Sequence, residues 1–262
     1  PSTCFSGIII HLVWFLNSED EILWRGEECK TPKSFYNEIR QALEGDYKIR
    51  LLYLYPDEIT DELIDEVASN TKIAPYFDIP IQHASNKMLV AMNRRGDQEL
   101  IRSLVKKIRT KIPHAIVRTT LITGFPGETE SDYEIMKDFV EEIKFNRLGV
   151  FAYSDEEGTK AYEFEPKVDS EIANMRKDEI MMIQQNISKE LNKQEVGKVY
   201  NVIIDNYDYT KKAYMARNSA YVPDDADGYI YIDSKQELVI GNIYQVEITD
   251  YTTYELKAKL IK

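Results

Sequence analysis

Glycine-rich and polar residues that could bind a ligand follow apolar segments at three places in this 262-residue chain. The most informative is Gly124-Phe125-Pro126-Gly127-Glu128, which follows the apolar run from Ile116 to Ile122. Glycine takes backbone angles closed to other residues, and the proline fixes the bend between the two glycines. We expect this loop to leave free backbone N–H groups at the carboxyl end of a strand, where α/β folds bind ligands. The alternative is an ordinary turn between a strand and a helix.

The two other places favour the ligand-binding interpretation. Gln82 and His83 follow the segment from Tyr76 to Ile81, and Tyr153 and Ser154 end the segment that begins at Leu148. Three polar strand ends in series are typical of one rim of a barrel. Structural alternatives exist, because His83 can be a polar residue at a helix start and Tyr153 can be a packing residue.

Alternating strands and helices are expected to position these residues. Thr60 can cap a helix that runs through Ser69, and apolar spacing predicts further helices over residues 98–111 and 130–144. On the last of these helices, four residues are expected to face inward: Ile135, Phe139, Val140 and Ile143. The spacing of Thr129 and Asp132 indicates a capping box at its start. Alternation through residue 153 predicts a parallel sheet, closed or partly closed into a TIM-like (β/α) barrel that is too short for eight units.

The pattern changes after this region. Residues 170–192 predict a long helix, whose apolar stripe is expected to contain Ile172, Met175, Ile180, Ile183, Ile187 and Leu191. From Val196 onward, apolar residues alternate with polar ones, and turn signals recur at Pro223 and Gly228. Five short strands in this region predict a small all-β barrel.

Four motifs, in this order, resemble the radical S-adenosylmethionine methylthiotransferases. They are Leu52-Tyr53-Leu54-Tyr55-Pro56, Gln82-His83, Arg118-Thr119-Thr120 with the loop through Thr129, and Tyr153 to Thr159. The variant most similar in these motifs modifies an aspartate of small-subunit ribosomal protein twelve. The resemblance covers roughly residues 31 to 262 and gives four parts: an atypical remnant (1–46), the later half of a radical SAM barrel (47–168), a linking helix (169–194) and a TRAM β-barrel (195–262).

The resemblance implies radical chemistry, in which a 4Fe-4S cluster cleaves S-adenosylmethionine and a methylthio group is inserted at the aspartate β-carbon. Cluster and nucleoside carry this chemistry while the protein positions them. The resemblance places S-adenosylmethionine near eleven residues: Gln82, His83, Arg118, Thr120, Gly124, Phe125, Pro126, Gly127, Glu128, Tyr153 and Ser154. Arg118 is a candidate for its carboxylate, although a structural carboxylate is the alternative partner. No catalytic residue and no metal ligand is assigned.

The cysteines depart from the family pattern. The family holds its cluster with a C-x-x-x-C-x-x-C loop, whereas this sequence has only Cys4 and Cys29. Two thiols cannot supply the ligands of a 4Fe-4S cluster. We therefore expect an N-terminally truncated barrel, a C-terminal portion that is inactive alone. The alternatives are a non-catalytic module that binds the target and a tRNA methylthiotransferase.

The acidic composition bears on the partner. The chain carries a net charge of −12, and residues 195–262 have 8 lysines and arginines against 11 aspartates and glutamates, a net charge of −3. Phosphate binding depends on cations, so tRNA is a poor match and a basic ribosomal protein a better one. The alternative is that the charge only maintains solubility. No apolar run approaches a membrane span, so a soluble cytoplasmic protein is expected.

Overall fold

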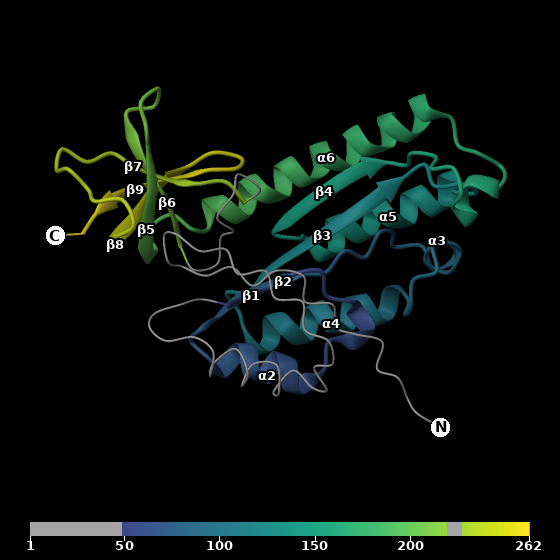
Figure 1. Cartoon of the computed structure of the whole chain (residues 1–262), viewed down its shortest axis with the longest axis horizontal. Coiled ribbons are helices and arrows are strands. Elements are labelled where there is room, and N and C mark those ends of the chain that lie inside the picture. Colours follow the sequence, from purple (N-terminus) through teal and green to yellow (C-terminus); the bar gives the residue numbers. More distant parts are fainter. Residues whose placement is uncertain (1–48, 219–226, 262) are drawn as a thin grey trace. The chain divides into compact units, whose positions relative to one another are not determined.

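The computed structural model describes residues 49–218 and 227–261 (Figure 1). The remnant expected at 1–46, with Cys4 and Cys29, lies outside the described residues. The described residues fall into two compact units, 49–183 and 184–261. Within these ranges, no helix has the length and apolar character that crossing a membrane requires.

The first unit contains a four-stranded sheet, as the alternating pattern predicts. Its strands are β1 (Ile49–Leu51), β2 (Ile73–Asp78), β3 (Ile116–Thr123) and β4 (Arg147–Ala152). They are hydrogen-bonded in the order β1-β2-β3-β4, and every pair is parallel. A parallel sheet in chain order with helical connections is the arrangement of part of a (β/α) barrel. The fold class expected for this region is therefore confirmed.

Helices connect and follow these strands. They are η1 (Pro56–Glu58), α2 (Asp61–Ser69), α3 (Asn86–Ala91), α4 (Gln98–Lys111), α5 (Glu130–Ile143), η2 (Lys160–Glu163) and α6 (Ser170–Lys193). The expected caps are confirmed, because Thr60 Oγ1 accepts the Leu63 N–H at 3.3 Å. At α5, Thr129 Oγ1 accepts from the Asp132 N–H at 3.3 Å, and Asp132 Oδ2 accepts from the Thr129 N–H at 3.0 Å. This reciprocal pair fixes the start of α5 directly after the glycine loop.

Polar contacts join the longer helices of this unit in chain order. Lys107 on α4 pairs with Asp61 on α2 at 2.7 Å, and Arg102 on α4 pairs with Glu142 on α5 at 2.6 Å. The Tyr133 hydroxyl on α5 donates to Glu179 on α6 at 2.7 Å. The helices thus succeed one another along the sheet (Figure 1). The parallel pairing of β1 to β4 places the carboxyl ends of the strands at one edge.

Three apolar positions, on α5 and α6, differ from the expectation. Ile135 is 39% exposed, while Tyr133 and Met136 are buried on α5. On α6, Ile172 and Met175 are exposed at 41% and 60%. The buried stripe of α6 instead contains Ala173, Arg176, Ile180, Gln184, Ile187, Ser188 and Asn192. The prediction was wrong because it followed apolar side chains, whereas the first turns of α6 bury an arginine that has carboxylate partners.

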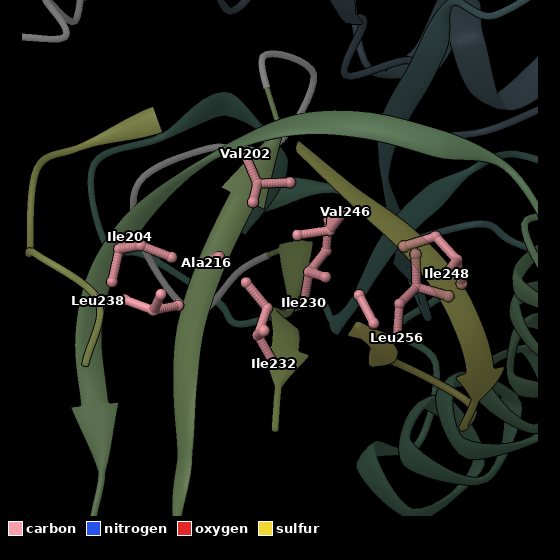
Figure 2. Close-up of a cluster of buried hydrophobic side chains, with 10 residues drawn as sticks. Val202, Ile204, Ala216, Ile230, Ile232, Leu238, Val246, Ile248 and Leu256 are labelled. Atoms are coloured by element: carbon pink, nitrogen blue, oxygen red, sulfur yellow. The ribbon is translucent and has the colours of Figure 1, made fainter. Parts of the chain in front are cut away.

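The second unit is a closed five-stranded barrel, as the period-two pattern predicts. Its strands are β5 (Val199–Asp208), β6 (Ala213–Asn218), β7 (Ile230–Ile232), β8 (Ile243–Tyr251) and β9 (Leu256–Leu260). They close in the order β5-β6-β7-β9-β8. Alternate residues of the strands fill the interior together with Leu238, which precedes β8. The core consists of Val202, Ile204, Ala216, Ile230, Ile232, Leu238, Val246, Ile248, Leu256 and Ala258, and Figure 2 labels all of these except Ala258.

Candidate functional site

Strand β3 separates the expected site residues into two faces. Val117, Thr119, Leu121 and Thr123 are buried, and the residues between them are half-buried. Arg118 and Thr120 therefore lie on the less buried face of the sheet. Their partners in the parallel pairing with β4, Arg147 and Gly149, lie on the same face. Arg118 Nε lies 3.9 Å from Asp78 Oδ1 at the end of β2. This face brings a cation, a hydroxyl and a carboxylate together.

Gln82 lies beside Thr120, at the end of the β2 segment. Its N–H donates to the Thr120 carbonyl at 2.9 Å, and its own carbonyl accepts from the Ile122 N–H at 2.8 Å. Its φ of 70° is in the left-handed region, which costs a non-glycine residue roughly 1 kcal/mol. Gln82 thus extends the pairing with β3 past the end of β2, and it is half-buried. The structure brings Gln82 and Thr120 together, as a shared site requires.

His83 lies in a different environment, because its side chain is fully buried. Its Nδ1 accepts from the N–H groups of Ala84 and Ser85, both at 2.9 Å. A ring nitrogen that accepts carries no proton, so Nε2 carries the hydrogen. Nε2 lies 3.5 Å from Glu128 Oε2. His83 therefore faces the carboxylate of the glycine loop inside the protein.

The glycine loop does not offer the row of free N–H groups that we expected. The Gly124 N–H donates to Glu128 Oε2 at 2.8 Å, and the Gly127 N–H donates to the Pro166 carbonyl at 2.8 Å. The Glu128 N–H closes a turn onto the Phe125 carbonyl at 2.9 Å. The Thr129 N–H is used in the capping box. The expectation of free N–H groups was therefore wrong for Gly124, Gly127, Glu128 and Thr129. The loop uses them to hold its own shape and its contact with the segment after η2.

Glu128 is the centre of a buried network that includes a residue outside every motif. Its Oε1 accepts from Arg176 Nη1 at 2.6 Å, and Arg176 Nη2 donates to Glu130 at 2.6 Å. The Glu128 side chain is fully buried, and Arg176 is 5% exposed. Burial alone would lower the pKa of the Arg176 guanidinium, but hydrogen bonds to Glu130 and Glu128 raise it above the ordinary value. The sequence contains one signal for Arg176. It is a basic residue in the buried stripe of a helix, and we expected that stripe to be apolar.

Asp132 is a second buried acid, for which the sequence predicts only a capping role. It accepts from the Ser85 hydroxyl at 2.6 Å and from Lys87 Nζ at 2.6 Å, besides its capping bonds to Thr129. Lys87 also donates to the Gly127 carbonyl at 2.8 Å. Burial raises the pKa of the Asp132 carboxyl, but the bonds from Lys87, Ser85 and Thr129 outweigh it and hold the pKa below the usual range. Asp132 thereby ties the segment after His83 to the glycine loop.

Aromatic residues cover the loop at the end of β4. The ring of Phe125 meets Tyr153 edge-on at 5.1 Å and Phe164 at 6.2 Å between centroids. The Tyr153 N–H donates to the Thr123 carbonyl at 2.8 Å, which extends the β3–β4 pairing by one residue. Burial, followed by contact with Asp155, raises the pKa of Tyr153. Phe125 and Pro126 are buried, Tyr153 is half-buried and Ser154 is exposed.

The described residues hold no group of three or more histidines, cysteines or acids placed to bind a metal ion. Both cysteines of the sequence precede residue 49, so the described part also contains no thiol. The eleven expected residues thus divide into a polar sheet end (Gln82, Arg118, Thr120, with Tyr153 and Ser154) and a loop (Gly124 to Glu128) supported by His83.

Two domain families match the sequence. Residues 14–140 match the Radical SAM superfamily, and residues 196–261 match the TRAM domain. The first match begins before residue 47, where we expected the barrel half to start.

Curated relatives match most of the chain. It is 45% identical over 214 residues to the "Ribosomal protein uS12 methylthiotransferase RimO" of Clostridium botulinum (strain Loch Maree / Type A3), which covers 82% of this chain and 47% of that protein. The protein with the same name from Acetivibrio thermocellus is 40% identical over 238 residues, covering 90% and 52%. The chain therefore spans about half the length of these relatives.

Among solved structures, coproporphyrinogen III oxidase (HemN) from Escherichia coli, described as a Radical SAM enzyme, superposes with a TM-score of 0.50. The match covers 61% of this chain and 39% of that one, at 18% sequence identity. At this identity the similarity concerns the fold alone.

Proposed function

Because this chain is a relative of the uS12 methylthiotransferases and matches both the Radical SAM and the TRAM families, we propose that it is part of a methylthiotransferase. The reaction would add a methylthio group to the β-carbon of an aspartate in ribosomal protein uS12. The observation that carries this proposal is the 45% identity over 214 residues, which make up 82% of this chain. We propose the division into residues 47–168, 169–194 and 195–262, with part of 1–46 also belonging to the Radical SAM region because that match begins at residue 14.

We propose that the polar sheet end binds S-adenosylmethionine. The donor set fits this molecule, because Arg118 offers a guanidinium for its carboxylate, and Gln82 and Thr120 offer neutral polar groups for its amine and ribose. Tyr153, which packs edge-on against the buried Phe125, supplies an aromatic group at the same end of the sheet. When bound, S-adenosylmethionine supplies the adenosyl group of the family's radical chemistry. The part of these residues is to bind and orient it.

The 4Fe-4S cluster of the family does not fit the described residues, which contain no cysteine. The sequence has two cysteines, whereas such clusters are held by three or four thiolates. We therefore propose that this chain by itself does not cleave S-adenosylmethionine.

We propose a basic ribosomal protein, rather than tRNA, as the target, and the cytoplasm as the place where they meet. The net charge of −12 repels a phosphate backbone and attracts a basic protein. Exposed carboxylates and aromatics also gather after β4, where Tyr162 and Phe164 are 44% and 37% exposed. The carboxylates of this segment are those of Asp155, Glu156, Glu157, Glu163 and Glu165. Carboxylates and aromatic faces are the groups that bind lysine and arginine.

The test of the target is a binding titration of the purified chain with uS12 and, separately, with bulk tRNA. We expect binding of uS12 that weakens as salt is raised, because screening acts on exposed charges at a Debye length of about 8 Å at physiological ionic strength. The variant Glu156→Lys/Glu157→Lys should bind uS12 more weakly. The matched control, Glu62→Lys/Glu66→Lys on α2, changes charge away from β4 and should have a smaller effect. Tighter binding of tRNA than of uS12 would contradict the proposed target.

A further inference from the structure

The shape of the glycine loop depends on one carboxylate. Glu128 Oε2 accepts from the Gly124 N–H at 2.8 Å, so the last residue of the loop is bonded back to the first. The same oxygen lies 3.5 Å from His83 Nε2. A fully buried carboxylate is costly unless cations and donors surround it. Glu128 can therefore stay ionised in this position only while its other oxygen has a charged partner.

Arg176 is that partner, and it comes from α6 rather than from the strands that form the site. Its Nη1 donates to Glu128 Oε1 at 2.6 Å, and its Nη2 donates to Glu130 at 2.6 Å. Its guanidinium carbon lies 5.1 Å from the centroid of the Tyr133 ring, a distance at which a cation is attracted to an aromatic face. The two carboxylates and the ring hold the guanidinium in one orientation.

The first turns of α6 also touch the loop directly. The Thr123 hydroxyl donates to the Ala173 carbonyl at 2.8 Å. A Cβ placed at Gly124 would lie 2.2 Å from the Cβ of Ala173, so only glycine permits this approach. The spacing of three residues between Ala173 and Arg176 puts both on one face of the helix. That face is therefore fitted to the loop.

We infer that Arg176, acting through Glu128, is a positioning residue that holds the Gly124–Glu128 loop in the shape needed at the S-adenosylmethionine site. The identity of the ligand in this inference rests on the proposed function. The effect of Arg176 on the shape of the loop is independent of the proposed function. Without the guanidinium, the buried Glu128 carboxylate must take up a proton or move toward water, and either change weakens or breaks its bond from the Gly124 N–H.

Amide hydrogen exchange of the whole chain tests the effect on the loop. In Arg176→Met, we expect the amide of Gly124 to exchange at least about 10-fold faster, since losing its bond to Glu128 is worth about 1.4 kcal/mol. Amides within β2 should keep their rates. Arg176→Lys retains one charge for Glu128 and should restore part of the protection. The matched control is Arg102→Met, because Arg102 also bridges two carboxylates, Glu99 and Glu142, but lies away from the loop.

The outcomes separate the two proposals. Faster exchange confined to the loop, with partial rescue by lysine, supports the positioning role. Unchanged loop amides, or an equal rise in all amides of the unit, would overturn it. A parallel titration with S-adenosylmethionine should give an affinity at least about 3-fold weaker for Arg176→Met than for the unchanged chain. If the unchanged chain binds no S-adenosylmethionine, the proposed function fails for the cofactor, and the exchange rates still decide the role of Arg176.

Discussion

Glu128 shows how a motif residue can shape a ligand-binding loop although its own side chain is buried and cannot contact a ligand. The sequence predicts Glu128 as part of a ligand-binding loop, and the structure places its side chain in the interior, between His83, Gly124 and Arg176. A motif read from sequence combines residues that would touch a ligand with residues that shape the loop. Burial separates these two roles, and burial at this position depends on Arg176, which is 48 residues away.

Arg176 binds two carboxylates, one buried (Glu128) and one exposed (Glu130), and this difference gives a first prediction. Glu128→Gln leaves the buried guanidinium without its interior carboxylate and should lower the free energy of unfolding by about 3 kcal/mol. Glu130→Gln removes a carboxylate whose side chain is 70% exposed and should cost about 0.5 kcal/mol. Urea unfolding followed by circular dichroism measures both. Equal losses for the two variants would contradict the buried role of Glu128.

The lowered pKa of Asp132 predicts a dependence on pH. Because its folded pKa lies below the unfolded value of about 3.9, the ionised carboxylate stabilises the fold above that pH, and the contribution is lost as pH falls. Asp132→Asn should therefore be less stable near pH 7 and should lose less stability than the unchanged chain between about pH 5 and pH 2. Thermal unfolding across this pH range checks this. Asp138→Asn, an exposed position on α5, is the control and should keep the full acid dependence.

At the scale of elements, the two glycines of the loop have different reasons to be glycine. Both have positive φ, 77° at Gly124 and 81° at Gly127. A Cβ at Gly124 meets Ala173, whereas a Cβ at Gly127 meets nothing within 4 Å. The sequence predicts the turn from both residues together, but only the position of α6 tells them apart.

This difference gives a third prediction. Gly127→Ala should cost about 1–2 kcal/mol from backbone strain alone. Gly124→Ala should cost about 2–5 kcal/mol, since it adds an overlap with Ala173 to a similar strain. The double variant Gly124→Ala/Ala173→Gly should recover the part due to overlap with the Ala173 Cβ, less the roughly 1 kcal/mol that glycine costs inside a helix. Unfolding free energies of the three variants measure these terms, and a Gly124→Ala no worse than Gly127→Ala would show that α6 does not press on the loop.

The elements themselves could be predicted from sequence where local chemistry decides them. The caps at Thr60 and Thr129 depend on side chains within three residues of the backbone groups they bind, so their spacing was sufficient. The buried face of α6 could not be predicted in this way. Its first turns bury Arg176 because carboxylates from the loop and α5 surround it, and that depends on tertiary contacts. The expectation of free N–H groups in the glycine loop was wrong mainly for a local reason. The N–H groups of Gly124, Glu128 and Thr129 donate to acceptors within four residues, and only the Gly127 N–H donates to a distant one, the Pro166 carbonyl.

At the scale of the whole molecule, the chain combines a polar sheet end, for which we propose cofactor binding, with a net charge of −12, and its sequence holds two cysteines. This gives a fourth prediction. After anaerobic reconstitution with iron and sulfide, we expect iron near zero per chain, because two thiolates are too few for a stable 4Fe-4S cluster. Colorimetric iron and labile sulfide assays measure this. About four irons per chain would mean that Cys4, Cys29 or an outside ligand builds a cluster.

The most direct test of the account is equilibrium dialysis of the purified chain against labelled S-adenosylmethionine. We expect saturable binding of one molecule per chain, weakened about 10-fold by Gln82→Ala/Thr120→Val, the loss of roughly one hydrogen bond. Thr110→Val, on the exposed side of α4, should bind like the unchanged chain. Absence of saturable binding, or equal affinity in the sheet-end variant, would contradict the claim that the carboxyl end of this sheet binds the cofactor.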